Sequence, residues 1–423
     1  MRGAMEDIRV LDLTRVLAGP WCTQMFADMG ADVVKIEHPK RGDDTRHWGP
    51  PYVQDELGEQ FEDSTYYAST NRNKKSVAID IATQEGAELV RKLAVNSDVF
   101  IENFKVGDLA RYGLDYETIR KINPRIVYCS ITGYGQSGPY ASRPGYDFVF
   151  QAEAGLMSIT GERDDLPGGG PQKVGVAIAD LTTGLYASTA ILAAINARHT
   201  TGVGQYIDMA LLDCMTALSS NQGLFQLVND IEPVRWGNAH PALVPYQVLK
   251  TQDASIVVAV GNDSQWAKFC NAIERDDLLN NPVYKRAAGR ITNREALLAA
   301  VEETVAGKTT AHWLEALTQA DVPHGRINNY RQTFEHPQVV HREMVVSVKS
   351  EESGAMVKNI ANPIKFSDTP VRHHTAAPSL GRHTHGVLGE LLGLSDAELE
   401  QLGSRGVIGT ANARKDAEIT AGK

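Results

Sequence analysis

The order of the first three predicted elements constrains the fold more than any other feature of the chain. Residues 8–13 form an apolar run typical of a buried strand, residues 20–29 have a helical pattern, and residues 32–37 predict a second strand. A strand, a helix and another strand in this order normally pair the two strands in parallel. We therefore expect an α/β fold that begins as a doubly wound, Rossmann-like parallel sheet.

Further strands are expected at residues 77–80, 98–101 and 126–131. Asp80, Asn103, Thr132 and Tyr134 then lie at or just beyond the carboxyl ends of strands. Ligands of open parallel sheets bind along that edge, so we expect the binding site there.

A dinucleotide is not the expected ligand. Glu37 ends the second strand, where dinucleotide-binding folds carry an acidic residue. The loop from Thr14 to Pro20 nevertheless contains one glycine, whereas the dinucleotide fingerprint has three. A Rossmann oxidoreductase remains as an alternative that the missing glycines weaken.

The middle of the chain has strands and helices of its own. Residues 1–225 are expected to form the first part of a large domain, residues 226–330 a smaller α+β domain, and residues 331–423 a return segment. Within the return segment we expect strands at 345–349 and 360–366, and a disordered tail after about residue 410.

Composition limits the partners and the compartment. The 423-residue chain carries a formal net charge of −10, which disfavours nucleic acid but permits a single anionic ligand in a local basic pocket. Its four cysteines are far apart in sequence, which favours reduced thiols in the cytoplasm over disulfides or a zinc site. No apolar run is expected to span a membrane and no secretory signal is expected at the N-terminus.

Asp180 is the candidate catalytic residue. The small, apolar residues 174–179 predict a short buried strand, and Leu181, Leu185 and Leu192 recur at helical spacing behind it. Asp180 therefore lies at a strand-to-helix junction. It is either the N-cap of the helix or a nucleophile with small neighbours that admit a substrate.

Two glycine-rich stretches lie before this junction. Residues 133–139 (Gly-Tyr-Gly-Gln-Ser-Gly-Pro) follow a strand end, so their N–H groups are candidate oxyanion donors. Residues 167–171 are interpreted as a turn.

Several motifs in the order found here resemble one family. They are Val10–Thr14 with Ala18-Gly19-Pro20, residues 30–37, Glu102-Asn103-Phe104, residues 133–139, Ala179-Asp180 before a helix, residues 202–205 and residues 378–384. Together they resemble the class III CoA-transferases, which include formyl-CoA and carnitine CoA-transferases and α-methylacyl-CoA racemase. The resemblance extends over nearly the whole chain.

The resemblance implies a fold, an assembly and a site. It implies a large Rossmann-like domain built from both chain ends, a small domain, and two chains interlocked as rings in a homodimer. It places the family's nucleophilic aspartate at Asp180, with coenzyme A as part of the substrate and no tightly bound cofactor or metal. Its CoA contacts would be Leu17, Ala18, His38, Ile79, Ala82, Asn103, Phe104, Lys105, Arg111, Thr132, Tyr134 and Gly135. At His38 some members have an arginine.

The expected reaction moves CoA between two carboxylic acids. An aspartate of ordinary pKa is ionised at neutral pH and needs no general base, so Asp180 could attack an acyl-CoA to give an anhydride and then an aspartyl-CoA thioester. Residues 238–241 and 244–247 resemble members that use succinyl-CoA and a short dicarboxylic or sulfinic acceptor. Candidate substrate-pocket residues are Arg46, Trp48, Arg72, Gln136, Asn238 and His240.

Two alternatives remain beside the oxidoreductase. An acyl-CoA racemase needs an acid and a base across the α-carbon, and the racemases resembled here have a histidine before Asp147 where this chain has Tyr146. A non-catalytic acyl-CoA-binding protein would not need Asp180.

Overall fold

We analysed a computed structural model of the chain, which describes residues 2–409. Contacts divide it into two compact units. Among the described residues, unit 1 comprises residues 2–156, 174–224 and 338–409, and unit 2 comprises residues 157–173 and 225–337. The sequence placed residues 157–173 in the large domain, whereas their contacts are with unit 2. The tail expected to be disordered after about residue 410 lies outside the described residues.

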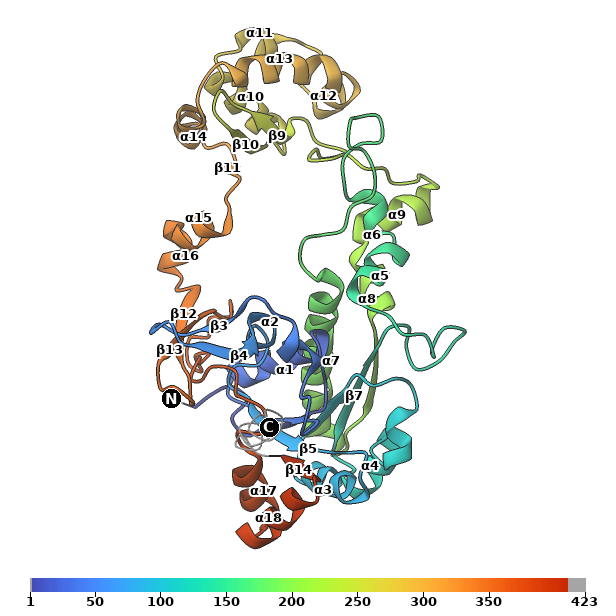
Figure 1. The fold of residues 1–423 in the computed structure, drawn as a ribbon. Coiled ribbons are helices and arrows are strands. Elements are labelled where there is room, and N and C mark those ends of the chain that lie inside the picture. Colours follow the sequence, from blue (N-terminus) through green and yellow to red (C-terminus); the bar gives the residue numbers. More distant parts are fainter. Residues whose placement is uncertain (1, 410–423) are drawn as a thin grey trace. The chain divides into compact units, whose positions relative to one another are not determined.

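A seven-stranded sheet organises unit 1 (Figure 1). Its order is β14-β5-β2-β1-β6-β7-β8, and all neighbours are parallel except β14 and β5. The strands are β1 (Arg9–Asp12), β2 (Asp32–Glu37), β5 (Lys75–Ile79), β6 (Val99–Glu102), β7 (Val127–Thr132), β8 (Tyr206–Ala210) and β14 (Ile408–Gly409). The predicted α/β fold with a mostly parallel sheet is confirmed.

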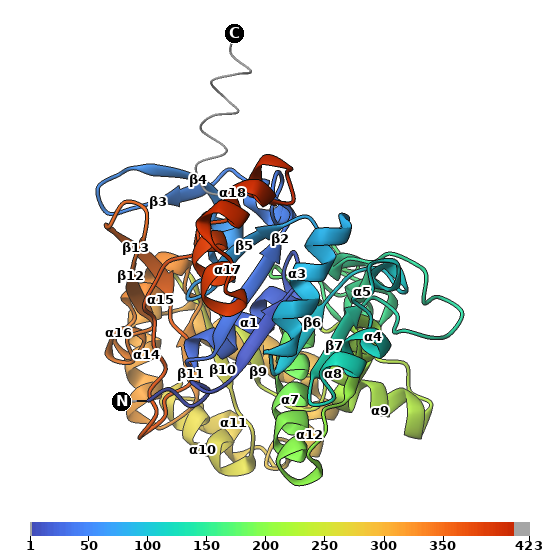
Figure 2. The same cartoon turned by 90° about the horizontal axis from the view of Figure 1, so that it is seen from below.

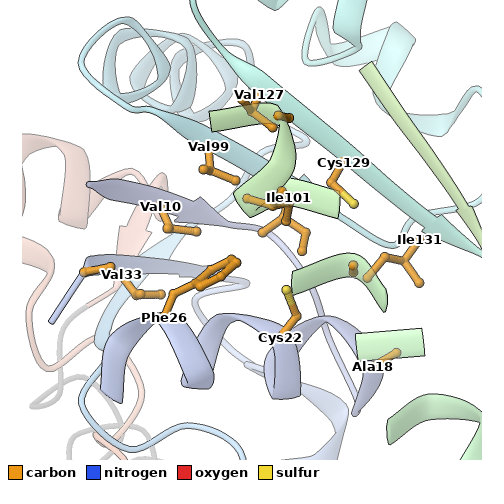
Figure 3. Packing of buried hydrophobic residues seen from close by; sticks show 14 of the residues in the cluster. Val10, Ala18, Cys22, Phe26, Val33, Val99, Ile101, Val127, Cys129 and Ile131 are labelled. Carbon is orange, nitrogen blue, oxygen red and sulfur yellow. The ribbon is translucent and has the colours of Figure 1, made fainter. Parts of the chain in front are cut away.

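Helices cover both faces of this sheet, because successive side chains of each buried strand point to opposite sides. Val10 of β1 packs into one core, with side chains of α1 (Ala18–Asp28), α5 (Asp147–Glu153), α7 (Ile178–Thr201) and α8 (Leu211–Leu218) (Figure 3). Leu11 packs into a second core, with side chains of α3 (Gln84–Val95), α4 (Tyr116–Ile122), α17 (Thr384–Leu392) and α18 (Asp396–Ser404). Helix α17 packs beside β5 and α3, and α18 packs against α17 and β14 (Figure 2), so segments from both ends of the described chain build this unit.

Helix α7 is long and apolar. Within residues 2–409 it has the length and composition to cross a membrane, although no such segment was expected. A core helix passes the same test, and Ala187, Ile191 and Ala194 of α7 are buried against α1 and the sheet.

Unit 1 also contains several short elements. Residues 39–65 contain a 3₁₀-helix (Asp44–His47) and the hairpin β3 (Tyr52–Gln54) and β4 (Gln60–Ser64), followed by α2 (Thr65–Ala68). A second 3₁₀-helix spans Asp108–Tyr112, and α6 spans Leu156–Ile159. The strand expected at 345–349 is β12 (Val345–Lys349), but its partner is β13 (Met356–Ile360), so the prediction of a strand at 360–366 is wrong.

Unit 2 has its own core beneath a three-stranded antiparallel sheet, β11-β10-β9. Trp266, Phe269 and Trp313 are its largest buried apolar side chains. Its strands are β9 (Tyr246–Lys250), β10 (Ser255–Ala259) and β11 (His324–Arg326). Its helices are α10 (Asp263–Ala272), α11 (Asp276–Asn280), α12 (Ala287–Thr292), α13 (Arg294–Ala306), α14 (Thr310–Gln319) and α15 (Tyr330–Glu335), while α9 (Ser220–Asn229) and α16 (Pro337–His341) cross its boundaries.

Candidate active site

Asp180 lies in the first turn of α7. The helix begins at Ile178, and the cap position belongs to Ala177, whose side chain makes no capping hydrogen bond. Residues 174–177 are irregular, so the predicted strand at 174–179 is wrong. The N-cap interpretation of Asp180 is wrong as well, because Asp180 is already inside the helix.

The carboxylate of Asp180 meets the N-terminus of a different helix. The backbone N–H of Ala18, the first residue of α1, hydrogen-bonds the carboxylate. The first N–H groups of a helix have no partner within it and stabilise an anion. The close approach depends on Gly184 of α7, because a Cβ there would lie 2.6 Å from the carbonyl oxygen of Ala18.

The environment raises the pKa of Asp180 to about 7. Burial is the main cause and the nearby charge of Asp147 is the second, while the hydrogen bond from Ala18 acts in the opposite direction. The expectation of an ordinary, fully ionised aspartate is therefore wrong. Near pH 7 the carboxyl group is divided between its neutral and ionised forms, and only the ionised form is a nucleophile.

A cavity of about 190 Å³ contains Asp180 in its wall. Segments that follow the carboxyl ends of β1, β6 and β7 supply most of the lining, as the parallel sheet predicts. Of the predicted CoA contacts, Leu17, Ala18, Asn103, Phe104, Lys105 and Thr132 line this cavity. We refer to it as the Asp180 cavity.

A second cavity, of about 240 Å³, shares Arg15 and Phe104 with the first. The Arg15 guanidinium lies 5.2 Å from the centre of the Phe104 ring. The predicted contacts His38, Ile79, Ala82 and Arg111 line this cavity, which we call the basic cavity. Ten of the twelve predicted CoA contacts therefore line one of these two spaces, and the two exceptions are Tyr134 and Gly135.

The basic cavity is lined by exposed cationic side chains together with Asp80 and Asp108. Arg41 is exposed, and Arg111 is largely exposed, 3.5 Å from Asp108 and with its guanidinium 4.8 Å from the centre of the Tyr112 ring. Partial burial and the neighbouring Arg41 lower the pKa of His38, whose Nδ1 accepts a hydrogen bond from the Lys40 N–H. Its Nε2 then carries the proton and can donate. Such a set of donors suits phosphate oxygens.

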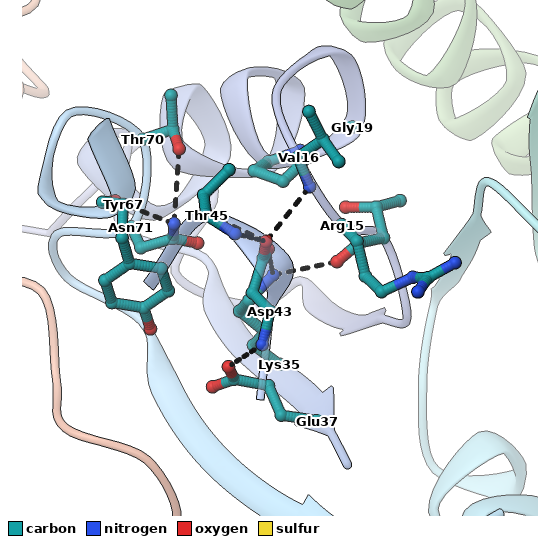
Figure 4. A network of polar contacts seen from close by, with 12 residues as sticks. Arg15, Val16, Gly19, Lys35, Glu37, Asp43, Thr45, Tyr67, Thr70 and Asn71 are labelled. Carbon is teal, nitrogen blue, oxygen red and sulfur yellow. Dashed lines mark hydrogen bonds and ion pairs between the residues drawn. The ribbon is translucent and has the colours of Figure 1, made fainter. Parts of the chain in front are cut away.

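The turn between β1 and α1 is held by buried charges (Figure 4). Val16 has φ +70°, a conformation that a β-branched residue adopts at a cost of about 1–3 kcal/mol. Its N–H donates to Asp43 at 3.2 Å, and Lys35 donates to Asp43 at 2.9 Å and to the Thr14 carbonyl at 2.8 Å. The side chain of Asn103 bonds both the N–H and the carbonyl of Arg15. These bonds fix the turn from which Ala18 reaches Asp180.

The glycine-rich stretch contributes less than expected. The N–H of Gly135 donates to the Thr132 hydroxyl, so this expected oxyanion donor is already occupied. Gly133 lines the Asp180 cavity and packs closely against Phe150. Tyr134 donates to Glu153, and the N–H of Gln136 donates to Asp208; neither residue lines the cavity.

Two predicted substrate arginines belong to the core instead. Arg46 is fully buried, pairs with Glu37 at 2.7 Å and Asp63 at 2.8 Å, and lies over the Tyr67 ring. Arg72 is 3% exposed and forms an ion pair with Asp28. Their guanidinium donors are used by these partners, which corrects the prediction that they bind substrate.

The other predicted substrate residues lie outside the Asp180 cavity. Trp48 is 43% exposed and packs edge-on against Tyr66, at 5.1 Å between ring centres. Asn238 and His240 belong to unit 2, where His240 packs against Tyr246.

The sequence analysis missed several residues that line the Asp180 cavity. They include Arg15, Val16, Asp44, Arg143 and Tyr146. Arg15 follows a predicted strand end, and this signal could have identified it. The others depend on tertiary contacts between distant segments.

The chain was compared with protein families, curated proteins and solved structures. The model of CoA-transferase family III matches residues 5–384. The succinate–glutarate CoA-transferase of Agrobacterium fabrum is 44% identical over 387 residues, covering 92% of this chain and 95% of that protein. The human succinyl-CoA:glutarate CoA-transferase is 42% identical over 405 residues, covering 96% and 90%.

A solved structure has the same fold. The crystal structure of a CaiB/BaiF family protein from Brucella suis matches with a TM-score of 0.81 and 42% sequence identity. The match covers 92% of this chain and 100% of that one.

Proposed function

The chain belongs to CoA-transferase family III and is a CoA-transferase, and we propose that it moves CoA from succinyl-CoA to a short dicarboxylic acid such as glutarate through a covalent intermediate on Asp180. The observation that carries the residue assignment is the Asp180 carboxylate in a cavity wall, hydrogen-bonded by the first N–H of α1. The names of the relatives support the donor and the acceptor class.

The proposed reaction needs no other nucleophile from the protein. Ionised Asp180 attacks the thioester carbonyl carbon of succinyl-CoA, and the C–S bond breaks to give an aspartyl–succinyl anhydride and CoA thiolate. The thiolate attacks the aspartyl carbonyl, which releases succinate and forms an aspartyl-CoA thioester. The acceptor carboxylate attacks this thioester, CoA thiolate leaves, and an anhydride between Asp180 and the acceptor forms. The thiolate then attacks the acceptor's acyl carbonyl, which gives the new acyl-CoA and free Asp180.

The two cavities suggest how CoA binds. Its phosphates carry negative charge, which matches His38, Arg41 and Arg111 in the basic cavity. The thiol end of CoA would then pass Arg15 and Phe104, which line both cavities, and reach Asp180. Lys105 and Arg143 line the Asp180 cavity and are candidates to attract the acceptor's second carboxylate.

We also propose that the protein functions as the interlocked homodimer that the family resemblance implies. Leu185, Tyr186 and Leu192 on α7 are 40–48% exposed in the single chain. Apolar side chains grouped along a helix favour burial against a partner, and a second copy of the chain would supply it. Light scattering after size exclusion should give the mass of two chains; a monomer at micromolar concentration would contradict this part of the proposal.

The central experiment is a CoA exchange assay with trapping. Wild type should transfer CoA from succinyl-CoA to glutarate in preference to monocarboxylates of similar length. During turnover, hydroxylamine should convert Asp180 to a hydroxamate that mass spectrometry locates. Asp180→Ala should lose exchange by at least about a thousandfold, since removal of a covalent nucleophile has effects of this order.

Controls separate this proposal from its alternatives. Asp7→Ala, which changes an exposed aspartate with only a 3.8 Å ion pair, should exchange CoA at the wild-type rate. An acyl-CoA deuterated at the α-carbon should keep its label, whereas a racemase would release it. Normal exchange by Asp180→Ala would refute the mechanism, and binding of acyl-CoA without any exchange would favour a binding protein.

A further inference from the structure

Two side chains of α5 hold the segment that leads into Asp180. Asp147 and Gln151 are four residues apart, and the Gln151 side-chain amide donates to one Asp147 carboxylate oxygen at 2.6 Å. The other carboxylate oxygen accepts the Ala179 N–H at 2.7 Å. The side-chain carbonyl of Gln151 accepts the Val174 N–H at 2.8 Å. The pair therefore binds both ends of residues 174–179.

Regular secondary structure does not hold this segment, in which the Val176 carbonyl accepts the Ile178 N–H at 2.8 Å. Residues 174–177 lie in no helix or strand, and a Cβ on Gly175 would meet no atom within 4 Å. Ala177 occupies the cap position of α7 without a capping side chain. A helix start normally needs an acceptor for its first N–H groups, and Asp147 supplies one from another helix.

The segment that Asp147 and Gln151 bind leads along the chain from unit 2 to Asp180. Val174 is the first residue of unit 1 after the chain returns from residues 157–173 of unit 2. Six residues later the chain reaches Asp180. Gln151 is completely buried, so its two bonds are protected from competition with water.

Asp147 also acts on Asp180 electrostatically. Asp147 accepts hydrogen bonds from two N–H groups, and its charge is the second cause of the raised pKa of Asp180, after burial. The other elements around Asp180 contribute the Ala18 N–H on α1 and, on α2, Tyr66, whose own pKa is raised to about 12 by burial and by Asp180. Arg15, Lys105 and Arg143 line the same cavity, together with Asp44.

We propose that Asp147, oriented by Gln151, is a positioning residue that fixes the start of α7 and places a negative charge near the nucleophile Asp180. The inference rests on the proposed function, because it assumes that Asp180 is the nucleophile. It assigns the pair formed by Asp147 and the buried Gln151 to catalysis and not only to packing.

The test is the pH dependence of exchange from succinyl-CoA to glutarate by the full-length protein. Wild type should lose activity as the pH falls through about 7, because protonated Asp180 cannot attack. Asp147→Asn keeps an acceptor for the Ala179 N–H but removes the charge, so this acid limb should move down by at least about half a pH unit. Glu153→Gln removes a charge from the exposed side of α5 and should leave the profile unchanged.

A second variant tests the positioning role. Gln151→Leu keeps the charge of Asp147 and releases the Val174 N–H, so kcat should fall about tenfold or more while the acid limb stays near the wild-type value. Near-UV circular dichroism checks that each variant is folded. If Asp147→Asn does not fold, the rate and the acid limb of Gln151→Leu decide the proposal.

The outcomes separate this inference from the proposed function. The positioning role would be overturned if folded Asp147→Asn kept the wild-type acid limb, or if Gln151→Leu kept the wild-type rate. In either case an inactive Asp180→Ala would still support Asp180 as the nucleophile. Normal exchange by Asp180→Ala would instead remove the basis of both.

Discussion

The close packing of α7 against α1 gives a quantitative prediction for Gly184→Ala. Gly184 lies one turn after Asp180, and a Cβ at this position would be 2.6 Å from the Ala18 carbonyl oxygen and 3.0 Å from Cδ1 of Trp21. Ordinary contact begins at 3.4 Å, so the two helices must separate by about 0.8 Å. The backbone oxygen cannot rotate away as a flexible side chain can.

The same movement affects stability and catalysis differently. Overpacking costs about 1–3 kcal/mol, and the higher helix propensity of alanine returns up to about 1 kcal/mol, so the free energy of unfolding should fall by about 0–3 kcal/mol. Separation of the helices also moves Asp180 away from the Ala18 N–H. A misplacement on the order of 1 Å at a reacting group costs about a hundredfold in rate. We expect a folded protein whose kcat is reduced by about 10- to 100-fold.

The assay compares urea unfolding with initial rates of CoA exchange from succinyl-CoA to glutarate. The matched control is Gly386→Ala in α17, where a new Cβ would meet no atom within 4 Å. That variant should gain up to about 1 kcal/mol in stability and keep the wild-type kcat.

Wild-type kcat in folded Gly184→Ala would refute the argument that contact between the two helices positions Asp180. A loss of stability above about 4 kcal/mol would also contradict it, because the helices would then have failed to adjust.

Two further predictions concern the charged groups. Arg46→Met should destabilise the protein by about 3–5 kcal/mol, since it leaves Glu37 buried without its partner, and should leave the preference among acceptor acids unchanged; a changed preference would restore Arg46 to the substrate site. Asp180→Asn should become more stable than wild type as the pH rises. The fold favours the protonated form of Asp180, because its pKa is about 7 in the folded state and about 3.9 in the unfolded state. The wild type therefore loses stability as the pH rises between these two values, and the asparagine variant does not. Chemical denaturation should show nearly equal stabilities at pH 4 and an advantage for the asparagine variant of up to about 4 kcal/mol at pH 8, and an advantage that does not depend on pH would contradict the raised pKa.

The local sequence pattern predicted strands of the large sheet correctly but predicted the segment before α7 wrongly. Residues 32–37 were predicted as a strand and form β2, because a buried parallel strand requires an apolar run whatever lies around it. Residues 174–179 have the same kind of composition and form no strand. Their backbone N–H groups at Val174 and Ala179 bond to side chains of α5, a contact that no local pattern reveals.

The sequence alone predicted the strands β1, β2, β5, β6 and β7 of the large sheet, and therefore the sheet edge at which distant segments converge on one site. It also identified Asp180, because a carboxylate among small residues before a long apolar helix is visible in the residue order. Tertiary structure alone decided that α1 supplies the hydrogen bond to Asp180, that Asp147 and burial raise its pKa to about 7, and that Arg46 and Arg72 are used in the core. The physical reason is that hydrogen bonding, burial and Coulomb interaction depend on distances in space, and these distances join residues that lie far apart in the chain.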